Sequence, residues 1–292
     1  MQCGVDESVP NSGDVIVRQH FVSSASDVTL AYAEYLPRQW NGLDVLLVHG
    51  LASSGAQFDR EAVRFAGLGF RILVPDLRGH GLSGVPQGPM AKADFTIPIM
   101  ADDLIEILDH ARAGQVHWVG NSLGGILALW LLGTPHAHRL RSLALFGTCF
   151  SMNLPTPVGW VLRAAFLPGR AITARLTALA TTASAIGRQA IETAIKQFNV
   201  EAGAAIAANV RHYDFHANAR TFQRHLLVLW GGLDHAVNLR LRGDMAKLVD
   251  HQNVRRIDLP SAGHCANFDM HDLFCVTLLA HWSAAGQPLL PP

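Results

Sequence analysis

The sequence predicts an α/β fold, with a mostly parallel sheet of eight strands, helices on both faces and an inserted helical cap. Short apolar runs alternate with helix-like segments along most of the 292 residues. Most of these runs are continuously apolar, which is typical of parallel strands that helices cover on both faces. One long alanine-rich segment interrupts the alternation and contains no strand-like run, which indicates an insertion.

The first three strands are expected at 15–22, 28–36 and 44–48, and the first two are close enough in sequence to pair as a hairpin. From there strands and helices alternate. We expect helices at 57–66, 98–113 and 123–132, and strands at 70–74, 116–119 and 140–146.

The alanine-rich segment, residues 151–222, is predicted to be the helical cap. The alternation resumes after it, with strands at 225–230 and 253–259 and helices near 239–249 and 269–284. Residues 1–150 and 223–292 are therefore expected to form the core around a single sheet.

Composition excludes several classes of protein. Basic and acidic side chains balance at 23 each, so no nucleic-acid partner is expected. No apolar run approaches the roughly 18 residues that cross a bilayer, so no membrane span is expected. The N-terminus carries Asp6, Glu7 and Asp14 but no early Lys or Arg, which argues against a signal peptide and for a cytoplasmic location.

Cysteine and histidine spacing indicates neither a metal site nor a cofactor. The four cysteines, Cys3, Cys149, Cys265 and Cys275, are far apart and form no C-x-x-C pair, so free thiols are expected. The 15 histidines are scattered without a metal-binding spacing. We predict a small molecule as the partner, and a homodimer is compatible with the sequence.

Gly120-Asn121-Ser122-Leu123-Gly124 is the main chemical signal. This G-x-S-x-G run joins a predicted strand to a predicted helix, which is the context of a nucleophile elbow that exposes a strained serine above the sheet. Glycines two residues either side of Ser122 are expected because strand and helix approach closely there. The alternative is a serine that merely caps the helix.

A serine nucleophile needs a histidine base and an acid that orients it. Asp234 follows the strand at 225–230, and His264 follows the last strand with Gly263 before it. Catalytic groups gather at the carboxyl edge of a parallel sheet, so Ser122, Asp234 and His264 are predicted to meet there. His235 is a weaker base candidate because it neighbours Asp234 and precedes the last strand.

Two backbone N–H groups are expected to stabilise the oxyanion of acyl transfer. One belongs to Leu123, the residue after the nucleophile, and the other to Leu51 in the loop that begins at His49-Gly50. His49 is interpreted as an organiser of this loop rather than a second base.

Taken in order, these motifs resemble the α/β-hydrolase superfamily from about residue 15 to 285. The similarity rests on "HG" at 49–50, "PDLRGHGLS" at 75–83, "GNSLGG" at 120–125, "GGLD" at 231–234 and "AGH" at 262–264. The resemblance implies that Asp76, Arg78, His80 and Ser83 support a loop rather than take part in the chemistry.

Within that superfamily the elbow and the closing "GHCANFD" are similar to ester, enol-lactone and meta-cleavage C–C hydrolases. The C–C hydrolases typically carry a Gly-Pro-Gly-rich oxyanion loop and an aromatic residue after the histidine, whereas this chain has "HGLASS" and Cys265. Ester or lactone hydrolysis without a cofactor is therefore the preferred function. C–C bond hydrolysis and a hydrolase-fold receptor for a small ligand are the alternatives.

The cap carries Arg163, Arg170, Arg175 and Arg188 between Ser151 and Ile191, with no Asp, Glu, Lys or His. Such a lid suits an acyl compound with an apolar part and a carboxylate, unless the arginines face solvent. Phe58, Trp160 and Phe166 are the candidate substrate-binding side chains, although Trp160 and Phe166 can equally attach cap to core.

Overall fold

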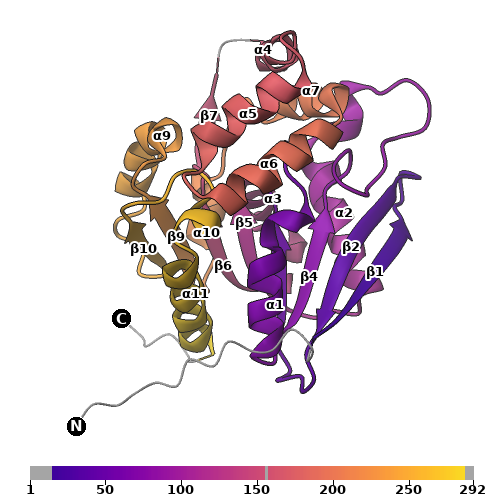
Figure 1. Ribbon diagram of the computed structural model, residues 1–292. Coiled ribbons are helices and arrows are strands. Elements are labelled where there is room, and N and C mark those ends of the chain that lie inside the picture. Colours follow the sequence, from indigo (N-terminus) through magenta and orange to yellow (C-terminus); the bar gives the residue numbers. More distant parts are fainter. Residues whose placement is uncertain (1–14, 155–156, 287–292) are drawn as a thin grey trace.

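The computed structural model describes residues 15–154 and 157–286. Among these residues, eight strands form one sheet in the spatial order β1-β2-β4-β3-β5-β6-β9-β10 (Figure 1). The strands are β1 (Ile16–Ser23), β2 (Thr29–Leu36), β3 (Asp44–Val48), β4 (Arg71–Asp76), β5 (Val116–Asn121), β6 (Leu140–Phe146), β9 (Leu226–Gly231) and β10 (Val254–Leu259). The predicted strands agree with these to within one or two residues.

Only the strands at one edge of the sheet run antiparallel. β1 pairs with β2 and β2 with β4 in antiparallel register, which confirms the predicted hairpin. The pairs β3 with β4, β3 with β5, β5 with β6, β6 with β9 and β9 with β10 are parallel. The carboxyl ends of β3, β5, β9 and β10 therefore reach the same edge of the sheet.

Helices cover both faces of the sheet, as the apolar strands predicted. They are α1 (Asp59–Gly67), α2 (Ile97–His110), α3 (Leu123–Leu131), α9 (His235–Ala246), α10 (Ala266–Asp269) and α11 (His271–Ala285), with 3-10 helices η2 (Gly55–Phe58), η3 (Lys92–Phe95) and η4 (Pro135–Arg139). In Figure 1, α1 and α11 lie in front of the sheet and α2 and α3 behind it.

The core divides into two apolar layers because side chains alternate along each strand. Leu46 and Val48 of β3 belong to the layer under α2 and α3, whereas Val45 and Leu47 belong to the layer under α1 and α11. Trp118 and Trp230 are buried in the first layer.

The cap segment, residues 151–222, contains five helices among its described residues and lies above the sheet in Figure 1. They are α4 (Val158–Ala165), α5 (Arg170–Thr181), α6 (Ala185–Gln197), α7 (Val200–Asn209) and α8 (His216–Thr221). The expectation of no strand here was wrong, because β7 (Ser151–Asn153) and β8 (His212–Asp214) pair in antiparallel register. Strands of three residues are too short to produce an apolar run.

No helix in the described ranges is long and apolar enough to cross a membrane. Cys149, Cys265 and Cys275 are free and buried, in agreement with the prediction from their spacing. Cys3, and the parts of the predicted core at 1–14 and 287–292, lie outside the described residues.

Candidate active site

Ser122 stands at a sharp turn between the end of β5 and the start of α3. Its backbone has φ 47° and ψ −108°, a conformation that L-residues rarely adopt. A Cβ atom at Gly120 would lie 2.6 Å from the backbone nitrogen of Gly125, and one at Gly124 would lie 2.3 Å from the carbonyl oxygen of Val48. The two glycines therefore allow the close approach on which a nucleophile elbow depends.

Asp234 and His264 form a hydrogen-bonded pair at the same sheet edge. Asp234 follows β9 and precedes α9, while His264 lies in the loop after β10. His264 Nδ1 is 2.9 Å from Asp234 Oδ2, and the carboxylate is buried whereas the imidazole keeps a quarter of its surface exposed. With Nδ1 committed to the carboxylate, Nε2 is the nitrogen left for proton transfer. His235 is exposed at the start of α9.

Asn121 ties the serine turn to the histidine loop. Its side-chain Nδ2 donates to the carbonyl of His264 at 3.2 Å, while the Ser122 N–H donates to the carbonyl of Phe146. A Cβ atom at Gly147 would lie 2.9 Å from His264 Cε1 and 2.9 Å from Asn121 Nδ2, so the imidazole packs beside the elbow. Within the described chain the Ser122 hydroxyl makes no hydrogen bond. Catalytic contacts of this kind often tighten only with substrate.

The two predicted oxyanion donors flank Ser122. A Cβ atom at Gly50 would lie 3.2 Å from Ser122 Cβ, so the loop that carries Leu51 passes directly beside the serine. Leu123 is the first residue of α3, where a helix leaves its N–H groups without internal partners. Neither the Leu51 nor the Leu123 N–H donates to another described residue.

Two buried neutral histidines hold the oxyanion loop in place. His49 Nδ1 is 2.7 Å from the Gly50 carbonyl, and its Nε2 accepts from the Leu77 N–H at 3.0 Å. His80 Nε2 accepts from the N–H of Ala52, whose φ is 59°. Burial lowers the pKa of His49 to about 4 and that of His80 to about 3, so both rings keep an acceptor nitrogen at neutral pH.

These rings predict acid sensitivity of the fold. Their pKa values are ordinarily 6.5 in the unfolded chain, so below about pH 6.5 the unfolded state binds more protons than the folded one. The contribution of these two histidines to the free energy of unfolding is therefore expected to be fully present above that pH. It should decrease as the pH drops toward 4. Urea unfolding at about pH 7 and about pH 5 measures this change. The free energy of unfolding of a His80→Gln variant should decrease less between these two pH values than that of the parent. An equal decrease in both proteins would contradict the assignment of acid sensitivity to His80.

The residues of the "PDLRGHGLS" motif are used structurally. Asp76 accepts from the N–H groups of Gly55 and Leu82, which fixes the start of η2 to the end of β4. Arg78 and Asp103 form a buried ion pair, and Ser83 bridges the Asp76 carbonyl and the Ala31 N–H.

The candidate substrate-binding aromatics lie in three different environments, and two of them require correction. Phe58 has no exposed surface and packs edge-on against Phe146 in the core, so it cannot form a pocket wall. Trp160 is two-thirds exposed and lines an outer cavity of about 440 Å³ whose lining does not include Ser122, Asp234 or His264. Phe166 packs against the apolar cluster that contains Ala174, Ala178 and Cys265, as does Ala52 of the loop after β3, so it remains a candidate.

The described contacts of the cap arginines lie away from Ser122, Asp234 and His264. Arg163 pairs with Glu201 at the surface, Arg170 donates to the Phe198 carbonyl, and Arg188 donates to the Ala183 carbonyl. Arg175 is exposed. For Arg163, Arg170 and Arg175 the solvent-facing interpretation therefore fits better than a carboxylate-binding role, whereas Arg188 is half-buried and its Nε makes no hydrogen bond to a described residue.

A buried polar network beneath the site was not predicted from the sequence. Gln57 Nε2 donates to Asn121 Oδ1 at 3.1 Å, and Asn267 Nδ2 donates to the Gln57 carbonyl at 2.9 Å and toward Glu61 Oε1. His271 completes it at 2.9 Å from Glu61 Oε1. The signal in the sequence was the i, i+4 spacing of Gln57 with Glu61, and of Asn267 with His271.

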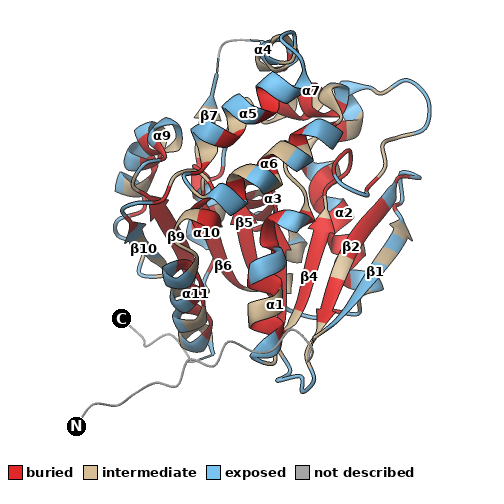
Figure 2. Ribbon diagram, viewed as in Figure 1, coloured by how far each residue is buried: buried red, intermediate tan, exposed pale blue. Residues whose placement is uncertain are grey.

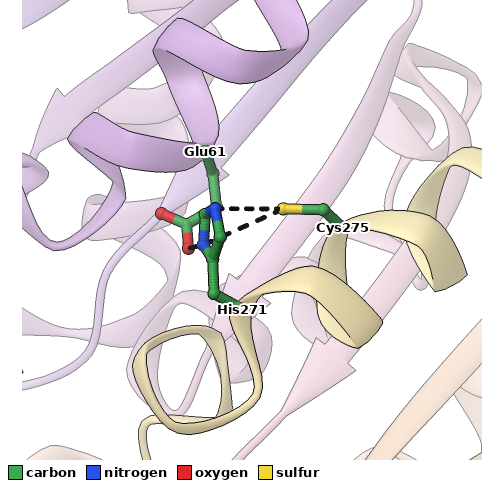
Figure 3. A group of neighbouring side chains, drawn as sticks. All are labelled: Glu61, His271 and Cys275. Atoms are coloured by element: carbon green, nitrogen blue, oxygen red, sulfur yellow. Dashed lines mark hydrogen bonds and ion pairs between the residues drawn. The ribbon is translucent and has the colours of Figure 1, made fainter. Parts of the chain in front are cut away.

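Figure 3 shows Glu61 of α1 facing His271 and Cys275 of α11. Their ligand-type atoms lie within 4.8 Å of one another, but Cys275 Sγ is 3.9–4.0 Å from the imidazole nitrogens. Tetrahedral zinc would bring such atoms to about 3.6 Å. Burial raises the pKa of the Cys275 thiol, so without a metal it stays protonated at neutral pH. We interpret the trio as a buried hydrogen-bonded pair beside a thiol.

Cys265, directly after His264, does not compete as a nucleophile. It is buried, and burial raises the pKa of its thiol to about 12. The group therefore stays protonated at neutral pH.

Comparison with known proteins places the chain among hydrolases of this architecture. The model of the alpha/beta hydrolase fold family matches residues 45–270. The magnesium-chelatase 30 kDa subunit of Rhodobacter capsulatus is 38% identical over 96 residues, and 3-oxoadipate enol-lactonase 1 of Acinetobacter baylyi is 33% identical over 95 residues. Each alignment covers 32% of this chain and 32% of the relative, so the chain spans about a third of their length.

A similar fold appears in solved structures. The enol-lactonase from Burkholderia xenovorans LB400 superimposes with a TM-score of 0.76 at 21% identity, over 90% of this chain and 100% of that one. The similarity at this identity concerns the fold.

Proposed function

The chain belongs to the α/β-hydrolase family, and from this premise we propose that it hydrolyses a carboxylic ester or lactone through an acyl-enzyme formed on Ser122. The observation that carries the proposal is the strained serine turn beside the hydrogen-bonded His264–Asp234 pair. A serine held this way, next to an oriented imidazole, is built for nucleophilic attack.

In the first half-reaction, Ser122 Oγ attacks the carbonyl carbon and its proton passes to His264 Nε2. The tetrahedral intermediate then collapses when His264 returns this proton to the leaving alkoxide. The alcohol departs from an ester, whereas in an opened lactone it remains as a hydroxyl group on the acyl chain bound to Ser122. In the second half-reaction His264 takes a proton from water, which attacks the acyl-enzyme, and Ser122 recovers its proton as the acid leaves. Asp234 stabilises the imidazolium in both halves.

The negative oxygen of each intermediate is stabilised by the N–H groups of Leu51 and Leu123. The first turn of α3 adds the favourable end of a helix dipole at the same place. The loop bearing Leu51 is held by His49 and His80, so its donor needs little rearrangement during the reaction.

Ester and lactone substrates are favoured over C–C bond cleavage. The similarity to enol-lactonases supports this choice. The oxyanion loop "HGLASS" lacks the Gly-Pro-Gly pattern that C–C hydrolases of this family carry. Phe166, which packs against the same apolar cluster as Ala52 of this loop, is the proposed apolar contact for the acyl part of the substrate.

The test is a substrate panel. We expect steady turnover of p-nitrophenyl acetate and butyrate, with a five-membered lactone as a further substrate and an acyl adduct detected on the Ser122 peptide by mass spectrometry. Faster hydrolysis of a dienoic ring-cleavage product than of any ester would favour C–C chemistry. Thermal stabilisation by these compounds without turnover would instead indicate a ligand receptor.

A further inference from the structure

Helix α5 of the cap segment exposes its large apolar side chains to solvent and packs its small residues inward. Ile172, Leu176 and Leu179 are 52%, 61% and 53% exposed, and their i, i+4, i+7 spacing puts them on one face. The opposite face, which packs inward, consists of small residues such as Thr173, Ala174 and Ala178. Figure 2 shows exposed and buried residues alternating along this helix. We call the exposed set Ile172, Leu176 and Leu179 the α5 stripe.

Further exposed apolar side chains accompany the stripe on the cap segment. Leu167, three residues before α5, is 84% exposed, and Trp160 and Val161 of α4 are also exposed. Chains that stay monomeric rarely leave so many large apolar side chains in water over one short segment, so such a surface indicates a binding partner.

The charge around the stripe identifies the kind of partner. Arg175 lies on the same face, between Ile172 and Leu176, and makes no ion pair within the described ranges. No Asp or Glu occurs between Ser151 and Ile191. Glu192 lies on the neighbouring α6, and Glu201 pairs with Arg163, so the charge carried by the α5 face itself is Arg175. An apolar helical face with a cation and no acid of its own matches the boundary between acyl chains and anionic headgroups of a bilayer.

A second copy of the chain fits this surface less well. A twofold interface brings the same patch against itself, so Arg175 would meet the same cationic surface with no carboxylate on α5 to neutralise it. Lipid phosphates supply the missing negative charge.

We propose that the α5 stripe and Arg175 dock the protein onto bilayer surfaces that contain anionic phospholipid. The inward face of the same helix contacts the histidine loop, because Ala174 and Ala178 pack with Cys265, and the Cys265 N–H donates to the Thr181 carbonyl at 3.1 Å. Docking therefore places the cap side of the candidate active site toward the lipid. The binding itself does not depend on the proposed hydrolysis.

Vesicle co-sedimentation of the full chain tests the proposal. Phosphatidylcholine vesicles with and without phosphatidylglycerol are compared at low and high salt. We expect binding to the anionic vesicles, weaker binding to pure phosphatidylcholine, and loss of the difference at high salt because exposed charges are screened. Arg175→Gln should weaken anionic binding about fivefold.

The variant Ile172→Gln/Leu176→Gln/Leu179→Gln should weaken binding at least about tenfold, because it removes the side chains that enter the lipid. Glutamine is a good helix former, so α5 should be retained in this variant. If the triple variant does not fold, the single Leu176→Gln variant is used in its place. Leu239→Gln, at an 86% exposed leucine on α9, is the matched control and should bind like the parent. Equal binding by stripe and control variants would overturn the proposal. So would a dimer in sedimentation equilibrium that dissociates on stripe substitution while vesicles remain unbound.

Discussion

Replacing Ser122 with alanine is expected to lower kcat for p-nitrophenyl butyrate by roughly 10⁴- to 10⁶-fold. Without Oγ no acyl-enzyme can form, and only the oxyanion donors and substrate binding remain to assist attack by water. Initial rates measured against the spontaneous hydrolysis of the ester give this ratio. The acyl adduct on the Ser122 peptide should disappear in the same variant.

The Ser122→Ala result is interpretable because the substitution leaves the turn in place. Alanine keeps the Cβ atom, so the backbone strain at φ 47° is about the same in both proteins, and the thermal midpoint should not change. Ser283→Ala is the matched control, since Ser283 is an exposed serine on α11 whose hydroxyl only contacts its own helix. If Ser122→Ala kept a substantial fraction of the parent's kcat, Ser122 would not be the nucleophile.

The elements of the core could be predicted because the central strands β3, β4, β5, β6 and β9 are almost continuously buried and apolar, and strands alternate with helices along most of the chain. The β5–Ser122–α3 turn was equally readable, since Gly120 and Gly124 are needed where Cβ atoms would overlap backbone atoms. The order of strands in the sheet was not predicted, because it depends on contacts between distant segments. The β7–β8 pair was not predicted because strands of three residues are too short to give a recognisable apolar run.

Side chains that function through tertiary contacts were harder to predict. Phe58 follows the oxyanion loop in sequence, which suggested a pocket wall, but η2 turns it inward onto Phe146. Gln57 and Asn267 look like ordinary polar residues until the fold brings them beneath Asn121. The apolar residues of the α5 stripe recur at helical spacing, and from the sequence such residues would be predicted to face the core. Only the structure shows that they face outward.

Replacing Asp234 with asparagine is expected to lower kcat by about 10⁴-fold while leaving the fold intact. The amide carries no charge to stabilise the imidazolium, and its NH₂ group can turn the His264 ring to the wrong tautomer. The Asp234 side chain also accepts from the Val237 N–H at the start of α9, and asparagine caps helices as well as aspartate does. The free energy of unfolding should therefore change little, and urea unfolding beside steady-state kinetics measures both effects.

The matched control is Asp258→Asn on β10, an exposed carboxylate that pairs only with Arg256 at the surface. Its kcat should equal that of the parent, because exposed ion pairs contribute little and this one is not part of the site. If kcat of Asp234→Asn fell only because the variant was largely unfolded under the assay conditions, Asp234 would be a helix cap without a role in the reaction. Unchanged kcat would remove it from the triad, and the hydrogen bond from His264 would then have to be explained as packing of the loop after β10.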